Sequence, residues 1–316
     1  EIAIGLLLLF WGADRLVIGA AATARNLGVS AVLVGLVVVG FATSAPEMLI
    51  SALAAMDNAP ALAVGNALGS NIANLGLVLG TAVLICPLAV HSQTLRREFP
   101  AVVGVTVLAT ALLLDRDLSR LDAFVLLGAM VAMTAWIIKV GSRSSVFDPL
   151  RTEYEDEIPA DMPAGKATFW LVVGLVTVLV GAELMVNGAT DIALLLGVSE
   201  LVLGVTIVAV GTSLPELAVA IAGAVKREAD LVLGNVLGSN IFNLLAVVGI
   251  AGAIRPHELE SDVITLHLPL MGGLTLAVFL LAYNSAMRVQ LTRPIGVALL
   301  AIFLIYQGFV VSDALM

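Results

Sequence analysis

The amino-acid sequence predicts an all-α integral membrane protein with ten transmembrane helices arranged as two inverted five-helix repeats. Hydrophobic residues make up 60% of the 316 residues and charged residues only 12%, with a mean hydropathy of +1.09. A soluble domain carries about 25% charged residues, so this chain cannot present a hydrated surface on every side. At about 20 apolar residues per span, a chain of this length holds about ten spans.

The same composition excludes several classes of protein. Cys86 is the only cysteine, which excludes an internal disulfide and argues against a redox pair. The formal net charge of -9 and the lack of a basic stripe argue against a nucleic-acid partner. The first apolar run is too long for a signal peptide, and a start at Glu1 inside that run predicts a trimmed N-terminus.

Apolar runs separated by short polar breaks predict the individual helices, and the lack of a period-two alternation argues against a β-barrel. The expected spans are residues 2–24, 31–56, 61–85, 99–114, 121–140, 167–190, 200–225, 230–253, 263–283 and 294–312. The polar segment 141–166 then divides the chain into a first repeat, residues 1–140, and a second repeat, residues 167–316. We interpret this acidic, proline-containing segment as a solvated linker, with a regulatory segment as the alternative.

The charges in the loops predict the orientation in the membrane. Of the 15 Lys and Arg residues, Arg15 lies inside the first span, and Arg116, Arg120 and Arg255 fall on one side. The remaining 11 (15 − 1 − 3) fall on the other side, which is therefore cytoplasmic. We expect both termini outside, the 141–166 linker inside, and a multi-pass monomer in the plasma (inner) membrane of a prokaryote.

The chain repeats itself at an offset of 169 residues without gaps from Gly12 to Gly80. The block from Thr43 to Glu47 matches the block from Thr212 to Glu216 (212 − 43 = 169), and Gly65–Leu75 matches Gly234–Leu244 with differences at two positions only. Five spans in each half place the second half in the opposite orientation. Inverted repeats of this kind are typical of transporters whose sites lie near the midplane on interrupted helices.

The first repeated block places a carboxylate in the middle of a span. A charged group at that depth costs at least about 2.5 kcal/mol, so Glu47 and Glu216 are functional candidates. Thr43 and Ser44 lie on the same helical face as Glu47, and Pro46 removes a backbone donor from that turn. The seventh span repeats this arrangement with Ala209, Gly211, Thr212, Ser213, Pro215 and Glu216.

The second repeated block places a polar stripe on the third and eighth spans. Asn66, Ser70 and Asn74 are spaced by four residues, and the second half repeats the stripe with Asn235, Ser239 and Asn243. Taken alone, such a stripe is also typical of helix packing. Together with the paired carboxylates, it predicts a set of oxygen ligands suited to hard cations such as Ca²⁺ and Na⁺.

Other ligands and other charged groups fit less well. The three histidines and Cys86 lie outside the repeated blocks, which argues against zinc and copper, and no Lys or Arg enters these blocks, which argues against an anion. We expect Asp14 to pair with its neighbour Arg15 at an interface, and Trp11, Trp136 and Trp170 to act as interfacial anchors.

With these motifs the chain resembles the cation/calcium antiporter superfamily, and most closely its prokaryotic sodium/calcium exchangers. The resemblance covers essentially the whole chain and rests on GTSLPE at 211–216 and on GNxxGSNIxN in both halves. It implies exchange of several sodium ions for one calcium ion, no cofactor, and the first and sixth helices sliding across the other eight.

The resemblance also implies roles for individual residues. Glu47 and Glu216 are the shared central carboxylates, and Asn74 and Asn243 complete the centre. Thr43 and Thr212 offer backbone carbonyls to calcium. Gly40 and Ala209 offer backbone carbonyls to sodium, and the hydroxyls for sodium come from Ser44, Ser213, Ser70 and Ser239.

Two departures from the family pattern stand out. Ala42 precedes Thr43 where glycine is usual, and position 243 is Asn where many relatives carry Asp, so two central carboxylates remain instead of three. This second departure leaves the stoichiometry open. The alternatives are a proton-coupled antiporter, another divalent cation such as Mn²⁺ or Mg²⁺, a cation channel, and a membrane enzyme. Two-fold repeats argue against the channel, and the lack of a Ser/His pair or a histidine cluster argues against the enzyme.

Overall fold

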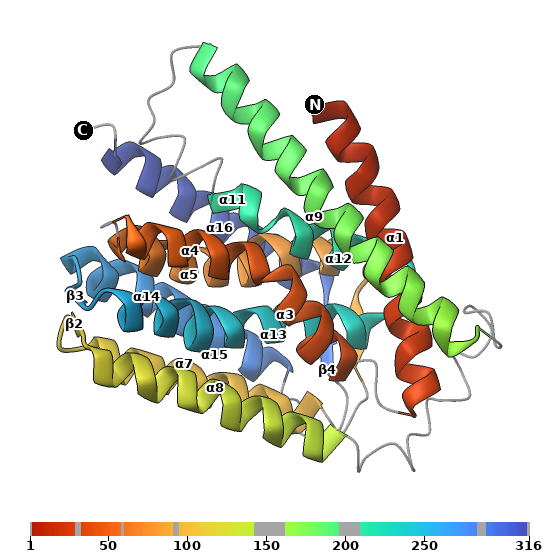
Figure 1. The fold of residues 1–316 in the computed structure, drawn as a ribbon, viewed down its shortest axis with the longest axis horizontal. Helices are drawn as coiled ribbons and strands as arrows, with labels where there is room; N and C mark the ends of the chain where they lie inside the picture. Colours follow the sequence, from red (N-terminus) through yellow and green to blue (C-terminus); the bar gives the residue numbers. More distant parts are fainter. Residues whose placement is uncertain are drawn as a thin grey trace.

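The computed structural model describes residues 2–28, 33–57, 60–90, 95–141, 162–195, 209–282 and 289–314, and this part of the chain is almost entirely helical (Figure 1). The expected linker falls mostly outside it, as does the start of the expected span 200–225. The helices of the first half are α1 (Ile2–Leu27), η1 (Val34–Val39), α3 (Gly40–Thr43), α4 (Ala45–Met56), α5 (Pro60–Ala73), η2 (Asn74–Val78), α6 (Leu79–Ile85), α7 (Leu95–Leu113) and α8 (Arg120–Gly141).

The helices of the second half repeat those of the first. They are α9 (Ala164–Leu195), α11 (Ala209–Thr212), α12 (Leu214–Val225), α13 (Ala229–Phe242), η5 (Asn243–Val247), α14 (Val248–Ile254), η6 (Val263–His267), α15 (Leu268–Ala282) and α16 (Arg293–Ala314). Five consecutive elements, from α3 to α6, have the same bounds as those from α11 to α14 when 169 is added to each residue number. The repeat seen in the sequence is therefore also a repeat of local structure.

The predicted interruption of the second span is present at Ser44. This residue leaves the helical conformation, with φ −81° and ψ 2°, and Ser213 does the same, with φ −87° and ψ 2°. Pro46 and Pro215 follow in the first turn of the next helix, where the missing N–H group of proline is tolerated. The helices on either side of Ser44 are bent by 41° relative to each other.

Length and composition show an all-helical, multi-pass membrane protein. Within the described residues, six helices are long and apolar enough to cross a membrane, or seven if the pair bent at Ser44 is one span. The six are the helices at 3–27, 60–85, 164–185, 229–254, 263–282 and 293–312. The ten spans expected from the sequence remain a prediction.

The long helices α1 and α9 pack against each other along their length and are tilted relative to the other helices (Figure 1). Their backbones approach closely because glycines line the contact. A Cβ atom on Gly19 would lie 2.3 Å from the backbone nitrogen of Leu171, and one on Gly174 would lie 2.4 Å from that of Leu16. Side chains larger than hydrogen do not fit there, so the two helices form one closely packed unit.

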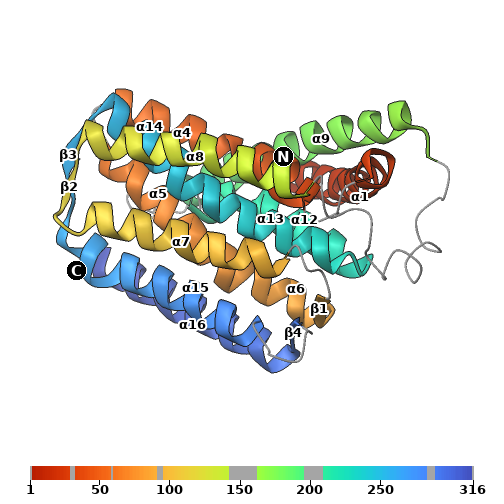
Figure 2. The same cartoon turned by 90° about the horizontal axis from the view of Figure 1, so that it is seen from below.

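Two short pairs of strands join the halves, one at each end of helices α7 and α15 (Figure 2). Strand β1 (Leu88–Val90) pairs antiparallel with β4 (Val289–Leu291), and β2 (Asp117–Leu118) pairs antiparallel with β3 (His257–Glu258). Between them, α13, η5 and α14 form a central span that is buried from Leu231 to Gly249. The polar stripes of the sequence therefore lie in the middle of the protein.

We predict that Gly174→Ala lowers the stability by about 1 to 3 kcal/mol, because the added Cβ atom overpacks the α1–α9 contact. Gly104→Ala is the control, since no atom lies within 4 Å of the added Cβ there. Alanine is favoured over glycine in a helix by about 1 kcal/mol, so this control should unfold at the wild-type temperature or above it. The measurement is thermal unfolding in detergent; equal midpoints for the two variants would contradict the packing described here.

Candidate cation site

The two helix breaks position the two buried carboxylates. Glu47 lies in the first turn of α4, directly after the break at Ser44, and Glu216 lies in the first turn of α12, after the break at Ser213. Each side chain is only 1% exposed. Within the described residues, neither carboxylate forms an ion pair with a Lys or Arg side chain. A helix N-terminus carries a partial positive charge, which offsets part of the cost of burying these groups.

Elements from both halves meet at Glu216. Gly40 in α3 and Gly238 in α13 allow a close approach, since a Cβ atom on Gly238 would lie 2.3 Å from the carbonyl oxygen of Leu36. As a result the Ser239 hydroxyl lies 3.3 Å from Glu216 Oε1 and 3.4 Å from the carbonyl oxygen of Gly40. The Thr43 hydroxyl is 3.3 Å from the Ser239 hydroxyl. Four predicted site residues are therefore in direct contact.

Contacts between threonine and asparagine also join the two repeats, and the contact at Thr212 is longer than its counterpart at Thr43. The Thr212 hydroxyl donates to Asn66 Oδ1 at 3.5 Å, and Asn66 Nδ2 donates to the Ser51 hydroxyl at 3.3 Å. On the other side, the Thr43 hydroxyl donates to Asn235 Oδ1 at 3.2 Å. Each threonine hydroxyl therefore lies within hydrogen-bond distance of an asparagine from the opposite repeat.

The remaining predicted residues are buried close to these helices. Asn74 begins the π-helical segment η2 and donates to Asn240 Oδ1 at 3.1 Å, while Asn243 begins η5. The other side chains in this group are Ser44, Ser70 and Ser213, each at most 1% exposed. The backbone of Ala209 starts α11, which packs on α5.

Many oxygen atoms in this region have no hydrogen-bond partner among the described residues. They are both carboxylate oxygens of Glu47, Glu216 Oε2, the hydroxyls of Ser44, Ser70 and Ser213, and the side-chain oxygens of Asn74 and Asn243. Buried polar atoms are normally paired, so unpaired oxygens of this number indicate a ligand that binds oxygen. Within the described residues there is no cluster of three His, Cys, Asp or Glu side chains. The donor set therefore fits a hard cation such as Ca²⁺ or Na⁺.

Asn71 and Asn240 were not among the predicted ligands, and Asn66 and Asn235 were predicted only as members of the polar stripes. Asn66 and Asn235 hold the threonine hydroxyls, and Asn240 accepts from Asn74 and, through its backbone carbonyl, from Asn71 Nδ2 at 3.2 Å. All four asparagines belong to the repeated GNxxGSN motif. Their contacts cross between the repeats, so spacing along one helix could not reveal them.

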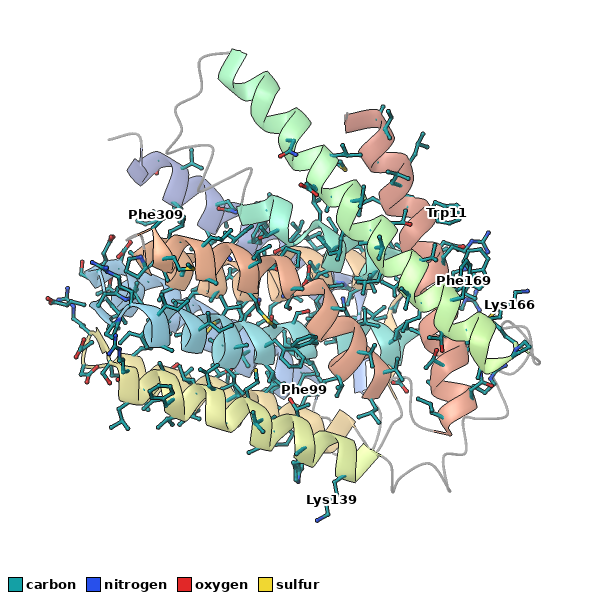
Figure 3. All side chains as sticks on the ribbon, viewed as in Figure 1. Trp11, Phe99, Lys139, Lys166, Phe169 and Phe309 are labelled. Carbon is teal, nitrogen blue, oxygen red and sulfur yellow. The ribbon has the colours of Figure 1, made fainter. Side chains whose placement is uncertain are left out.

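The predicted pairing of Asp14 with Arg15 is corrected in part. The Arg15 Nε atom is 3.8 Å from Asp14, but Lys226 Nζ lies closer, at 2.7 Å. The Arg15 guanidinium lies 4.9 Å from the ring centre of Trp170 and 5.8 Å from that of Trp11. Figure 3 shows Trp11 on α1 and Phe169 on α9, projecting away from α4 and α5. Arg15 makes cation–π contacts with Trp11 on α1 and Trp170 on α9, and Asp14 pairs more closely with Lys226 than with Arg15.

Comparison with known proteins identifies relatives along the whole chain. The profile of the family described as sodium/calcium exchanger protein matches residues 2–139 and 166–312. The protein CaxA of Alkalimonas amylolytica is 43% identical over 312 residues, which cover 99% of this chain and 98% of CaxA. The inner membrane protein YrbG of Escherichia coli K12 is 38% identical, with 96% and 93% covered.

A solved structure is similar in fold as well. The sodium-calcium exchanger NCX_Mj, soaked with 10 mM Na⁺ and 10 mM Sr²⁺, superimposes with a TM-score of 0.84 at 33% sequence identity. The match covers 96% of this chain and 95% of NCX_Mj.

We predict that calcium raises the unfolding temperature of the wild-type protein and not that of Glu47→Gln. Binding to the folded state alone stabilises it, whereas the variant loses a carboxylate of the site. Without calcium or sodium, Glu47→Gln should be the more stable protein by about 1 to 3 kcal/mol, because a buried charge without a partner is removed. Thr106→Val, in α7, is the control and should keep the calcium response. An equal response of Glu47→Gln and the wild type would exclude Glu47 as a ligand.

Proposed function

Because the chain belongs to the sodium/calcium exchanger protein family, we propose that it exchanges sodium for calcium across the membrane by alternating access at a midplane site. The observation that carries the proposal is the group of buried oxygen atoms without hydrogen-bond partners, which includes the carboxylates of both repeats. The name of NCX_Mj, a sodium-calcium exchanger, supports sodium as the coupling ion.

In this proposal Glu47 and Glu216 bind calcium from opposite repeats, together with the carbonyls of Thr43 and Thr212. Sodium ions use the Ser44, Ser213, Ser70 and Ser239 hydroxyls and the Gly40 and Ala209 carbonyls. Asn74 and Asn243 complete the centre. The contact of Ser239 with Glu216 and Gly40 supports a sodium position next to the calcium position.

The proposed architecture is ten spans in two inverted repeats, residues 1–140 and 167–316, joined by a cytoplasmic linker at 141–166. The matching element bounds of the two halves support it. Both termini lie outside the plasma membrane of a prokaryote, and the monomer is the transporting unit within the bilayer. The cycle uses no cofactor, since its substrates are the ions themselves.

Charge explains why such a site exchanges ions and does not leak them. Two ionised carboxylates buried without a counter-charge are costly, and one calcium ion or several sodium ions supply that charge. We propose that only the loaded forms move between the inward-facing and outward-facing states. Each ion then leaves only when the other kind replaces it.

We predict that proteoliposomes loaded with sodium take up radioactive calcium when they are diluted into sodium-free medium. Uptake should require internal sodium and be unaffected by an imposed proton gradient. Glu216→Gln should abolish the uptake while the protein remains folded. Uptake driven by the proton gradient alone would replace this proposal with a proton-coupled antiporter of calcium or another divalent cation, and calcium flux without any counter-ion would indicate a channel.

We predict that Asn243→Asp changes the sodium dependence of the uptake, because a third buried carboxylate adds a negative charge that an additional cation must neutralise. The sodium concentration for half-maximal exchange and the slope of that dependence are the quantities to measure. Asn240→Asp, four-fifths of a turn away on the same helix, adds the same charge next to Asn74 and serves as the comparison. An unchanged sodium response in Asn243→Asp would remove this position from the ion path.

A further inference from the structure

An ion pair connects the α1–α9 unit to helix α12. Lys226 is the C-cap residue of α12, and its Nζ atom lies 2.7 Å from Asp14 Oδ1 in the middle of α1. Both side chains are partly exposed, at 30% and 42%. Because Arg15 lies against Trp170, Lys226 is the closest cationic partner of Asp14 among the described residues.

The two repeats do not pack on the α1–α9 unit in the same way. Helix α1 packs extensively against α12, whereas among the described residues α9 has no comparable packing against α4, the counterpart of α12. The unit lies toward the end of the molecule that carries β1 and β4 (Figures 1 and 2). Since the halves are repeats in sequence, an alternative arrangement in which α9 packs against α4 uses equivalent surfaces.

One of the two charges of this ion pair changes sign at the equivalent position in the other half. Adding 169 to Asp14 gives Glu183, on α9, and subtracting 169 from Lys226 gives Asp57, the C-cap residue of α4. In the alternative arrangement, two acidic side chains would therefore meet where an ion pair lies here. Like charges at close distance repel, so this arrangement lacks the attraction and adds a repulsion.

We propose that the Asp14–Lys226 ion pair is an electrostatic latch. It favours the conformation seen here, in which α1 packs against α12, over the alternative in which α9 packs against α4. The proposal rests on the proposed alternating access, because it assigns a bias to that equilibrium. A partly exposed pair is worth a modest amount, so we expect the latch to change the ratio of the two conformations by about five-fold. It sets which face of the membrane the site opens to when both ions are equally available.

The test measures the distance between the α1–α9 unit and the helices around it. Spin labels are placed at Val176 on α9 and Phe124 on α8, two exposed positions, in a Cys86→Ser background that removes the only native cysteine. Distances are recorded by pulsed electron paramagnetic resonance in saturating calcium. We expect Lys226→Glu to reduce the population of the present distance relative to the alternative about five-fold, and Asp57→Lys to act in the same direction by pairing with Glu183.

Three further variants complete the experiment. Arg227→Glu makes the same charge change one residue away and should leave the distances unchanged, while Asp14→Lys combined with Lys226→Glu should restore the wild-type ratio. Wild-type distances in the combined Lys226→Glu/Asp57→Lys protein would overturn the latch, as would an equal effect of Arg227→Glu. Sodium-dependent calcium uptake by the unlabelled wild type is measured in parallel, so a failure of the proposed function is seen separately.

Discussion

The burial of two carboxylates without protein cations is the constraint on which the rest of the structure depends. Glu47 and Glu216 lie where neither water nor a lysine or arginine of the described chain neutralises them. Such groups are stable only next to a mobile cation or after protonation. Serine hydroxyls, asparagine amides and interrupted backbone therefore surround them, and the helices that carry these groups occupy the centre of the molecule.

Close backbone packing makes this polar centre possible. Gly40 and Gly238 bring α3 onto α13, so that Ser239 reaches both a carboxylate and a backbone carbonyl of the other repeat. The same device at Gly19 and Gly174 joins α1 to α9 at the periphery. In a bilayer, where apolar burial gives helices little reason to associate, such contacts supply the association through van der Waals packing.

The sequence predicted the interrupted helices and the buried carboxylates correctly because both depend on local chemistry repeated at an offset of 169 residues. Proline position and helical spacing place Glu47 and Thr43 without any knowledge of tertiary structure. The pairing of Asp14 with Lys226, and of Asn74 with Asn240, could not be predicted in the same way. Those contacts join elements far apart in the chain, and their partners depend on how the helices lie against each other. The short strand pairs were missed because two or three residues carry no clear pattern.

The strand pairs β1–β4 and β2–β3 have a mechanical consequence. Each pair ties a loop of the first half to a loop of the second, and the two lie at opposite ends of helices α7 and α15. Relative movement of the two halves would break backbone hydrogen bonds at both strand pairs. The helices that these strands connect therefore form a stiff frame. Within the described residues, the α1–α9 unit is not clamped to that frame by any strand. A deformation of the protein should therefore displace the α1–α9 unit relative to this frame more readily than it displaces the two halves of the frame relative to each other.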